Sequence, residues 1–171
     1  MTYPDPRYHG ETGEISATYR PSSTTPDVTY ASGTTCDYVA TGASTGGLFG
    51  LYRWSMLPRA GGPAAHFHRT MAESFYVLIG SVRIFDGREW LDAQQGDFVH
   101  VPPGGLHGFR NDSDAPASML IHFAPGAPRE AYFEGLARWA TEGRPGPEAL
   151  EAFYQEHDNL FVEPGSSGHA R

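Results

Sequence analysis

The chain has 171 residues, close to the usual size of one domain, and a formal net charge of −8 with histidine neutral. This acidic balance argues against a partner such as nucleic acid, whose backbone requires a basic surface, and no apolar run is long enough to cross a membrane. Cys36 is the only cysteine, which excludes internal disulfides and thiolate metal clusters.

The first 33 residues are poor in apolar side chains and rich in proline, serine and threonine, as residues 20–26 illustrate. We expect an extended arm over residues 1–33 that either lies over the domain or is exchanged with a partner subunit, so that it could support a homodimer. The N-terminus lacks the basic and apolar regions of a signal peptide. This favours a cytoplasmic location.

Residues 34–125 show the pattern of many short strands joined by tight turns. Glycine (21 residues) and proline (14 residues) are abundant, and 13% of the chain is aromatic. Asp86-Gly87 is a strong signal for a two-residue hairpin turn. The expected strands are residues 35–41, 48–57, 73–79, 81–85, 89–92, 97–101, 107–111 and 118–123. About eight to ten such strands without an intervening helix predict an all-β fold, an antiparallel barrel or double-sheet jelly roll.

Beyond residue 125 the apolar pattern changes to the period of a helix. In residues 129–141 the apolar side chains share one helical face, and Gly143 is the stop signal. Pro147 suits the first turn of a second helix that ends near His157. We therefore expect a helical extension over residues 126–163 that packs against the barrel. The Gly/Ser-rich tail, residues 164–171, is expected to be disordered.

Four side chains of metal-ligand type form two compact clusters among the strands. Alternate residues of a strand point to the same face, so His66 and His68 point to one side. Glu73 lies an odd number of residues beyond His68, which predicts a turn or bulge between them. His107 opens a strand after a Pro-Pro-Gly-Gly turn. Three imidazoles and one carboxylate suit a borderline divalent transition metal, provided that the fold brings them together.

The two clusters resemble the two sequence motifs of the cupin superfamily. Residues 96–111 match the family spacing G-x5-P-x-G-x2-H-x3-N at every position, and residues 66–80 match as H-x-H, four residues, Glu, six residues and Gly. The opening glycine departs by one position, because Ala60 stands where the family has glycine and Gly61 follows it. The match covers about fifty residues, and its specificity is high because glycine, proline and ligand positions agree together.

The resemblance implies a cupin β-barrel that holds one divalent transition metal. Iron, nickel, manganese, copper and zinc all remain candidates, since the ligands do not choose among them. Cupins with three histidines and one glutamate include flavonol dioxygenases, acireductone dioxygenases and metal-dependent cyclases, and the helical tail makes the chain most similar to single-domain bacterial quercetinase-like cupins. This similarity implies a dioxygenase that binds dioxygen and a planar aromatic hydroxy-carbonyl compound of flavonol or polyketide type. The implied metal ligands are His66, His68, Glu73 and His107.

Glu73 is the candidate catalytic residue, because a carboxylate ligand can leave the metal and act as a general base. This role assumes that apolar neighbours raise the pKa of Glu73. Apolar residues on the surrounding strands are expected to be core residues, some of which also line the substrate pocket. The candidates for the pocket are Phe75, Val77, Phe109, Met119 and Ile121.

Two other functions stay open at this point. A non-redox cyclase or isomerase would use the same four ligands, and a ligand-binding cupin would have the pocket without turnover. His100 and His122 fall on expected strands, but strand parity alone does not decide whether either faces the pocket. His9, His157 and His169 are interpreted as a turn residue, a helix-end residue and a tail residue.

Overall fold

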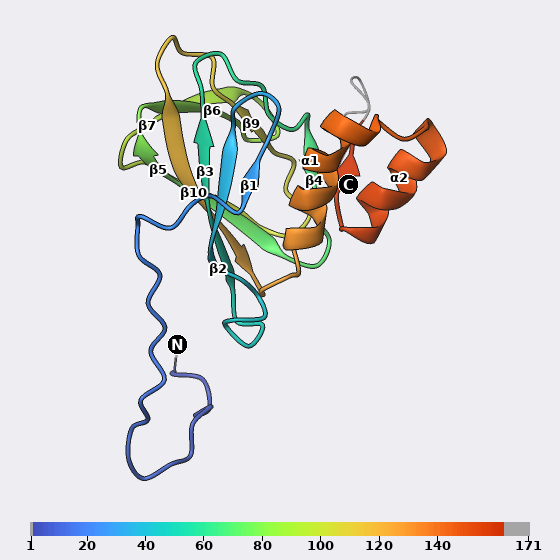
Figure 1. Ribbon diagram of the computed structural model, residues 1–171. Coiled ribbons are helices and arrows are strands. Elements are labelled where there is room, and N and C mark those ends of the chain that lie inside the picture. The colour runs from blue at the N-terminus through green and yellow to red at the C-terminus, as the bar shows by residue number, and fades with distance from the viewer. Residues whose placement is uncertain (1, 163–171) are drawn as a thin grey trace.

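The computed structural model describes residues 2–162, and the predicted tail lies outside the described residues (Figure 1). Strands dominate, and two helices follow them. In chain order the elements are β1 (Val28–Thr29), β2 (Thr35–Ala40), β3 (Gly50–Met56), β4 (His66–Phe67), β5 (Ala72–Ile79), β6 (Ser81–Phe85), β7 (Trp90–Gln94), β8 (Phe98–Val101), β9 (Gly108–Arg110), β10 (Ala117–Ala124), α1 (Glu130–Glu142), α2 (Pro147–Glu156) and β11 (Leu160–Phe161).

Two antiparallel sheets form the body of the domain. The larger has the strand order β1-β2-β3-β10-β5-β8, and the smaller has the order β7-β6-β9. Aromatic side chains from both sheets meet between them, with the rings of Phe75 and Phe109 5.7 Å apart. The non-sequential strand order and the shared core confirm the predicted all-β antiparallel jelly-roll fold.

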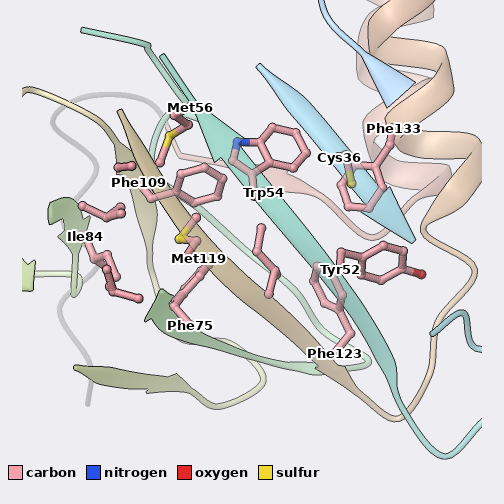
Figure 2. Packing of buried hydrophobic residues seen from close by; sticks show 14 of the residues in the cluster. Cys36, Tyr52, Trp54, Met56, Phe75, Ile84, Phe109, Met119, Phe123 and Phe133 are labelled. Carbon is pink, nitrogen blue, oxygen red and sulfur yellow. The ribbon is translucent and has the colours of Figure 1, made fainter. Parts of the chain in front are cut away.

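The core follows from the alternation of side chains along the central strands. In β3 every second residue is buried, and β10 pairs with it so that Ile121 lies opposite Tyr52 and Met119 opposite Trp54. From the smaller sheet, Phe109 meets Trp54, with ring centroids 5.9 Å apart, and Figure 2 shows both in the same apolar cluster. Each such large apolar side chain contributes about 1.5–3 kcal/mol when fully buried.

The N-terminal arm is extended and points away from the barrel over most of its length (Figure 1). Residues 2–27 contain no helix or strand. Val28 and Thr29 then pair with Cys36 and Thr35 of β2 as the edge of the larger sheet. Residues 2–27 therefore lead away from the edge of the larger sheet, and the exchange of the arm with a partner subunit stays a prediction.

The C-terminal extension consists of two helices and a short strand. Phe133 of α1 packs on Tyr52 and Trp54 of the barrel, with ring centroids 5.1 and 5.6 Å apart. The extension then ends in β11, which pairs with β4. No local sequence pattern predicted this strand. Neither helix in residues 2–162 has the length and apolar character needed to cross a bilayer.

Candidate metal centre

The fold brings the four ligand-type side chains to one point. His66 lies on β4, His68 follows it, Glu73 lies on β5 and His107 immediately precedes β9. All four are buried, and one ligand atom from each lies within 4.8 Å of the others. His66 and His107 also exchange two backbone hydrogen bonds of 2.9 Å, which join the two motifs directly.

A turn between β4 and β5 brings Glu73 to the same side as the histidines. The chain bends at Arg69 and Thr70, and the Asp158 carboxylate accepts hydrogen bonds from both backbone N–H groups at 2.8–3.0 Å. The Thr70 hydroxyl donates to the same carboxylate at 2.7 Å. The turn that the parity of Glu73 required is thus held by a residue from the far end of the chain.

The Pro-Gly turn places the fourth side chain. Gly104 has φ of +83°, a conformation that glycine adopts without a steric penalty. Its N–H donates to the carbonyl of His68 at 2.7 Å, so the turn that delivers His107 is attached to the first motif.

All three imidazoles present the same nitrogen to the centre. The Nδ1 atoms of His66 and His107 donate to the carbonyls of Ala64 and Gly105 at 2.9 Å, and that of His68 donates to the carbonyl of Asp158. With the proton on Nδ1, each neutral ring has a lone pair on Nε2. Carbonyl partners of this kind orient metal-binding histidines in proteins.

The spacing of the donor atoms fits a cation. Oε2 of Glu73 lies 2.9 Å from Nε2 of His68 and 2.8 Å from Nε2 of His107. Burial lowers the pKa of His107, but the charge and hydrogen bond of Glu73 outweigh burial and raise it. A proton on Nε2 therefore joins His107 to the carboxylate, and a metal that binds here would take the place of that proton. Because burial lowers the pKa of His66 to about 3, this ring stays neutral and available as a ligand. These residues could therefore hold a divalent metal.

The pKa of Glu73 differs from the expectation. Burial raises it, but the nearby charges and hydrogen bonds of His107 and His68 outweigh burial and hold the pKa well below its usual range. The expected increase from the apolar wall of Phe75 and Val77 is thus wrong, because the carboxylate contacts imidazoles rather than that wall. Glu73 is ionised, as a metal ligand must be.

The centre opens into a cavity of about 640 Å³, within the range that binds small organic ligands. His66 and Glu73 belong to its wall, together with residues from the barrel and from both helices. Its lining is mostly apolar, with charged residues such as Arg144 and Glu151 among the rest. The aromatic lining residues are Tyr30, Trp54, Phe109, Phe123, Tyr132, Phe133, Tyr154 and Phe161.

The apolar residues expected around a substrate divide between cavity and core. Phe109 and Ile121 line the cavity. Phe75, Val77 and Met119 are fully buried in the core and do not line it.

His100 and His122 both face away from the cavity. They lie on the outer face of the larger sheet, in a separate depression. His100 bonds Ser74 through Nδ1 at 3.0 Å, and His122 stacks on Phe49. Along β8 and β10 they alternate with the inward-facing residues, so their side chains point to the other face of the sheet. Neither histidine therefore lines the cavity, a point that strand parity alone did not decide.

The sequence did not predict several residues of the site, because they come from the C-terminal extension and carry no ligand motif. Asp158 fixes the turn before Glu73 and orients His68, and β11 brings Phe161 to within 5.4 Å of the His66 ring. Arg129 and Asn159 line the cavity as buried polar residues. Their only signal in the sequence is that they flank two amphipathic helices.

A protein-family comparison identifies the central part of this fold. The family model described as "Cupin domain" matches residues 52–123, which include both ligand clusters. Residues 52–123 form a cupin domain. Part of the chain is also similar to quercetin 2,3-dioxygenase of Bacillus subtilis (strain 168), with 35% identity over 48 residues. This match spans 28% of the chain and 14% of the length of that relative.

Solved structures support the cupin fold of this domain. A predicted oxalate decarboxylase from Thermotoga maritima matches with a TM-score of 0.57 at 17% identity, covering 64% of this chain and 99% of the other. An RmlC-like cupin from Shewanella frigidimarina NCIMB 400 matches with a TM-score of 0.50 at 17% identity, covering 63% and 88%. At such identities the likeness concerns the fold alone.

Proposed function

We propose that this cupin is a metal-dependent dioxygenase acting on a planar aromatic compound with a hydroxyl group next to a carbonyl. One observation carries the proposal: His66 and Glu73, two members of the buried ligand group, form part of the wall of an aromatic cavity large enough for such a compound. A purely structural metal site is closed by its protein ligands, whereas a catalytic one adjoins space for a substrate.

The cavity suits a flat apolar ring system. Trp54, Phe109 and Phe123 present ring surfaces from the barrel, and Tyr132 and Phe133 cover them from α1. The short likeness to quercetin 2,3-dioxygenase favours this substrate class and the use of dioxygen. A bound divalent metal would polarise the chelated carbonyl and lower the pKa of the neighbouring hydroxyl.

Glu73 is the residue we propose to accept the hydroxyl proton. Its Oε2 contacts His68 and His107, while Oε1 accepts no hydrogen bond from residues 2–162. Because Glu73 lines the cavity, Oε1 is the atom available to a substrate hydroxyl. The low pKa of Glu73 makes it a weak base, so that the role requires a substrate acidified by chelation.

An oxygen-electrode assay tests this function. Untagged protein is analysed for its metals and then supplied with a panel of flavonols and smaller hydroxy-carbonyl aromatics. We expect oxygen to be consumed in step with one of these substrates. Product formed equally well without oxygen would instead show a cyclase or isomerase, and binding without any product would show a ligand-binding protein.

Glu73→Gln tests the role of the carboxylate. The amide keeps the shape of the side chain and an oxygen ligand but is a far poorer base. We expect the variant to retain most of its metal and to lose roughly 10²–10⁴-fold in kcat, the usual contribution of a general base. Wild-type turnover in metal-loaded Glu73→Gln would contradict the role.

A further inference from the structure

The cavity contains a second polar site beside the candidate metal centre. Arg129, Tyr132 and Asn159 all line it and are 3%, 5% and 2% exposed. The Asn159 amide donates to the Tyr132 hydroxyl at 2.9 Å and its oxygen accepts from Nη2 of Arg129 at 2.8 Å. We call these three residues the arginine corner. It is a linked, buried polar group in a wall that is mostly apolar.

The arginine corner has more hydrogen-bond donors than the protein uses. A guanidinium has five N–H groups. Nη1 of Arg129 donates to the carbonyl of His157 at 2.6 Å and Nη2 to Asn159, while Nε has no partner within residues 2–162. The Tyr132 hydroxyl accepts from Asn159, and its own hydrogen has no acceptor in the described part of the chain. Unused donors of this kind favour an oxygen-rich ligand.

The charge of Arg129 is likewise unbalanced. No carboxylate in residues 2–162 lies within ion-pair distance of its guanidinium, although buried arginine is usually paired. Its two protein acceptors are neutral, and the rings of Phe123 and Tyr132, 5.0 and 4.4 Å from its Cζ, compensate only part of the charge. A divalent metal beside Glu73 would add a second cation to the wall that contains Arg129.

The arginine corner lies one aromatic ring away from the metal ligands. Phe123 contacts both sites, since its ring centroid is 6.1 Å from that of His68 and 5.0 Å from the Arg129 guanidinium. Phe123 is also the backbone partner of Glu73 between β10 and β5. Glu73, Arg129 and Tyr132 line the same cavity, so one molecule in it can reach both sites.

We propose that Arg129 and Tyr132 bind an anionic oxygen group of the substrate, a carboxylate in the first instance, while the other end of the same molecule lies at the metal ligands. The inference rests on the proposed function in taking the cavity as the substrate site, and it narrows the substrate to an acid. A carboxylate supplies the acceptors and the negative charge that this wall lacks.

Binding of matched probes without oxygen tests the inference separately from turnover. Comenate and kojic acid share a hydroxy-pyranone that chelates metals, but comenate carries a carboxylate where kojic acid has a neutral hydroxymethyl group. 3-Hydroxyflavone and its 4′-carboxylate form a longer pair. Calorimetry on metal-loaded protein gives the preference for the acid within each pair. We expect at least about a tenfold preference in one pair, as a charge-assisted hydrogen bond provides.

Three variants locate the preference. Arg129→Met should bind the two members of the preferred pair with equal affinity, and Arg129→Lys should keep part of the preference. Tyr132→Phe removes only a hydroxyl, and should weaken binding of the acid several-fold even if Arg129→Met does not fold. Arg138→Met is the matched control, an exposed arginine on α1, the helix that begins directly after Arg129, and should behave as the wild type. Metal content and circular dichroism are measured for each.

The outcomes separate this inference from the proposed function. Wild-type protein that binds both members of each pair equally would overturn the inference, as would an Arg129→Met or a Tyr132→Phe variant that keeps the full preference. A preference for the acids without oxygen consumption would support the arginine corner and contradict the dioxygenase. Oxygen consumption without any such preference would support the dioxygenase and contradict the role of the arginine corner.

Discussion

The hydrogen bonds on the outer nitrogens decide what the three histidines can do. Each Nδ1 is occupied by a backbone carbonyl, so each Nε2 is left for the centre. A carbonyl oxygen accepts a hydrogen bond from Nδ1 but does not take its proton. These bonds therefore fix the tautomer of each ring and leave the ring without a negative charge. At the scale of single residues, the centre is therefore prepared by the backbone before any metal binds.

His107→Ala and His100→Ala form a matched pair that tests this arrangement. His107 belongs to the ligand group, whereas His100 lies on the outer face of the sheet. We expect His107→Ala to weaken metal affinity by more than the roughly 10–100-fold that follows the loss of an outer-shell partner. His100→Ala should keep the wild-type metal content. Elemental analysis after dialysis against a competing chelator measures both, and equal metal contents would contradict the assignment.

At the scale of elements, the turn between β4 and β5 depends on Asp158. This residue has φ of +53°, a left-handed conformation that aspartate tolerates better than most residues. Burial raises the pKa of its carboxyl, but the hydrogen bonds from Thr70 and Arg69 outweigh burial and lower it. The carboxylate is thus ionised at neutral pH and holds the turn that aims Glu73.

Asp158→Ala should release this turn. We expect a loss of about 1–2 kcal/mol in the free energy of unfolding, measured by urea denaturation, because hydrogen bonds to a half-exposed charged group are removed. The metal affinity should fall about tenfold as His68 and Glu73 lose their fixed spacing. Because the folded-state pKa is depressed, the contribution of Asp158 is present above the ordinary aspartate pKa and disappears as the pH falls below it. Glu156→Ala, an exposed acidic residue nearby, is the control.

The sequence predicted those elements whose pattern is local. Turn residues on either side of short segments predicted β3 and β10, the Asp86-Gly87 turn predicted β6 and β7, and the apolar period predicted both helices. β1, β4 and β11 have two residues each, too few for a pattern. β1 is defined by its pairing with the next strand, β2, whereas β4 and β11 pair with each other from distant parts of the chain.

The candidate site shows the same division between local and distant information. The H-x-H spacing and the Pro-Gly turn predicted which side chains converge. The pKa of Glu73 and the facing of His100 could not be predicted, because both depend on three-dimensional neighbours. The arginine corner joins residues 129, 132 and 159, and no sequence spacing relates them to the ligand clusters.

Segments from distant parts of the molecule meet at the candidate metal centre. The four side chains come from β4, β5 and the segment before β9, and the C-terminal extension bonds to one of them. A ligand that binds only the folded state stabilises it by mass action, by about 2.7 kcal/mol at one hundred times its dissociation constant. A metal bound here would therefore stabilise both the barrel and the extension.

Removal of the metal should lower the thermal stability of the whole domain. For a chain of this size we expect a fall in Tm of about 5–10 °C on treatment with a chelator. Adding the native metal should restore the original Tm. His68→Ala should show no response to the chelator, and a response equal to that of the wild type would mean that the metal stabilises the protein from another site.

The homodimer remains a prediction at this scale. The outer face of the larger sheet exposes Tyr76, Ile79 and Phe98, and the arm extends away from the barrel. Either surface could contact a second copy. The molar mass in solution decides whether it does.

The hydrogen bond from His68 to the Asp158 carbonyl shows that the candidate metal centre depends on residues outside the stretch that matches the family model. The match to the cupin family model ends at residue 123, while the atom that orients one of the matched histidines lies thirty-five positions later. The residues that match the family model and the residues that form and support the candidate metal centre are therefore not the same set. A barrel that ends at β10 would keep all four ligand residues and lose the hydrogen bond that orients His68. Substitutions in α1 and α2, between residues 130 and 156, would instead change the wall of the cavity and leave the ligand residues in place.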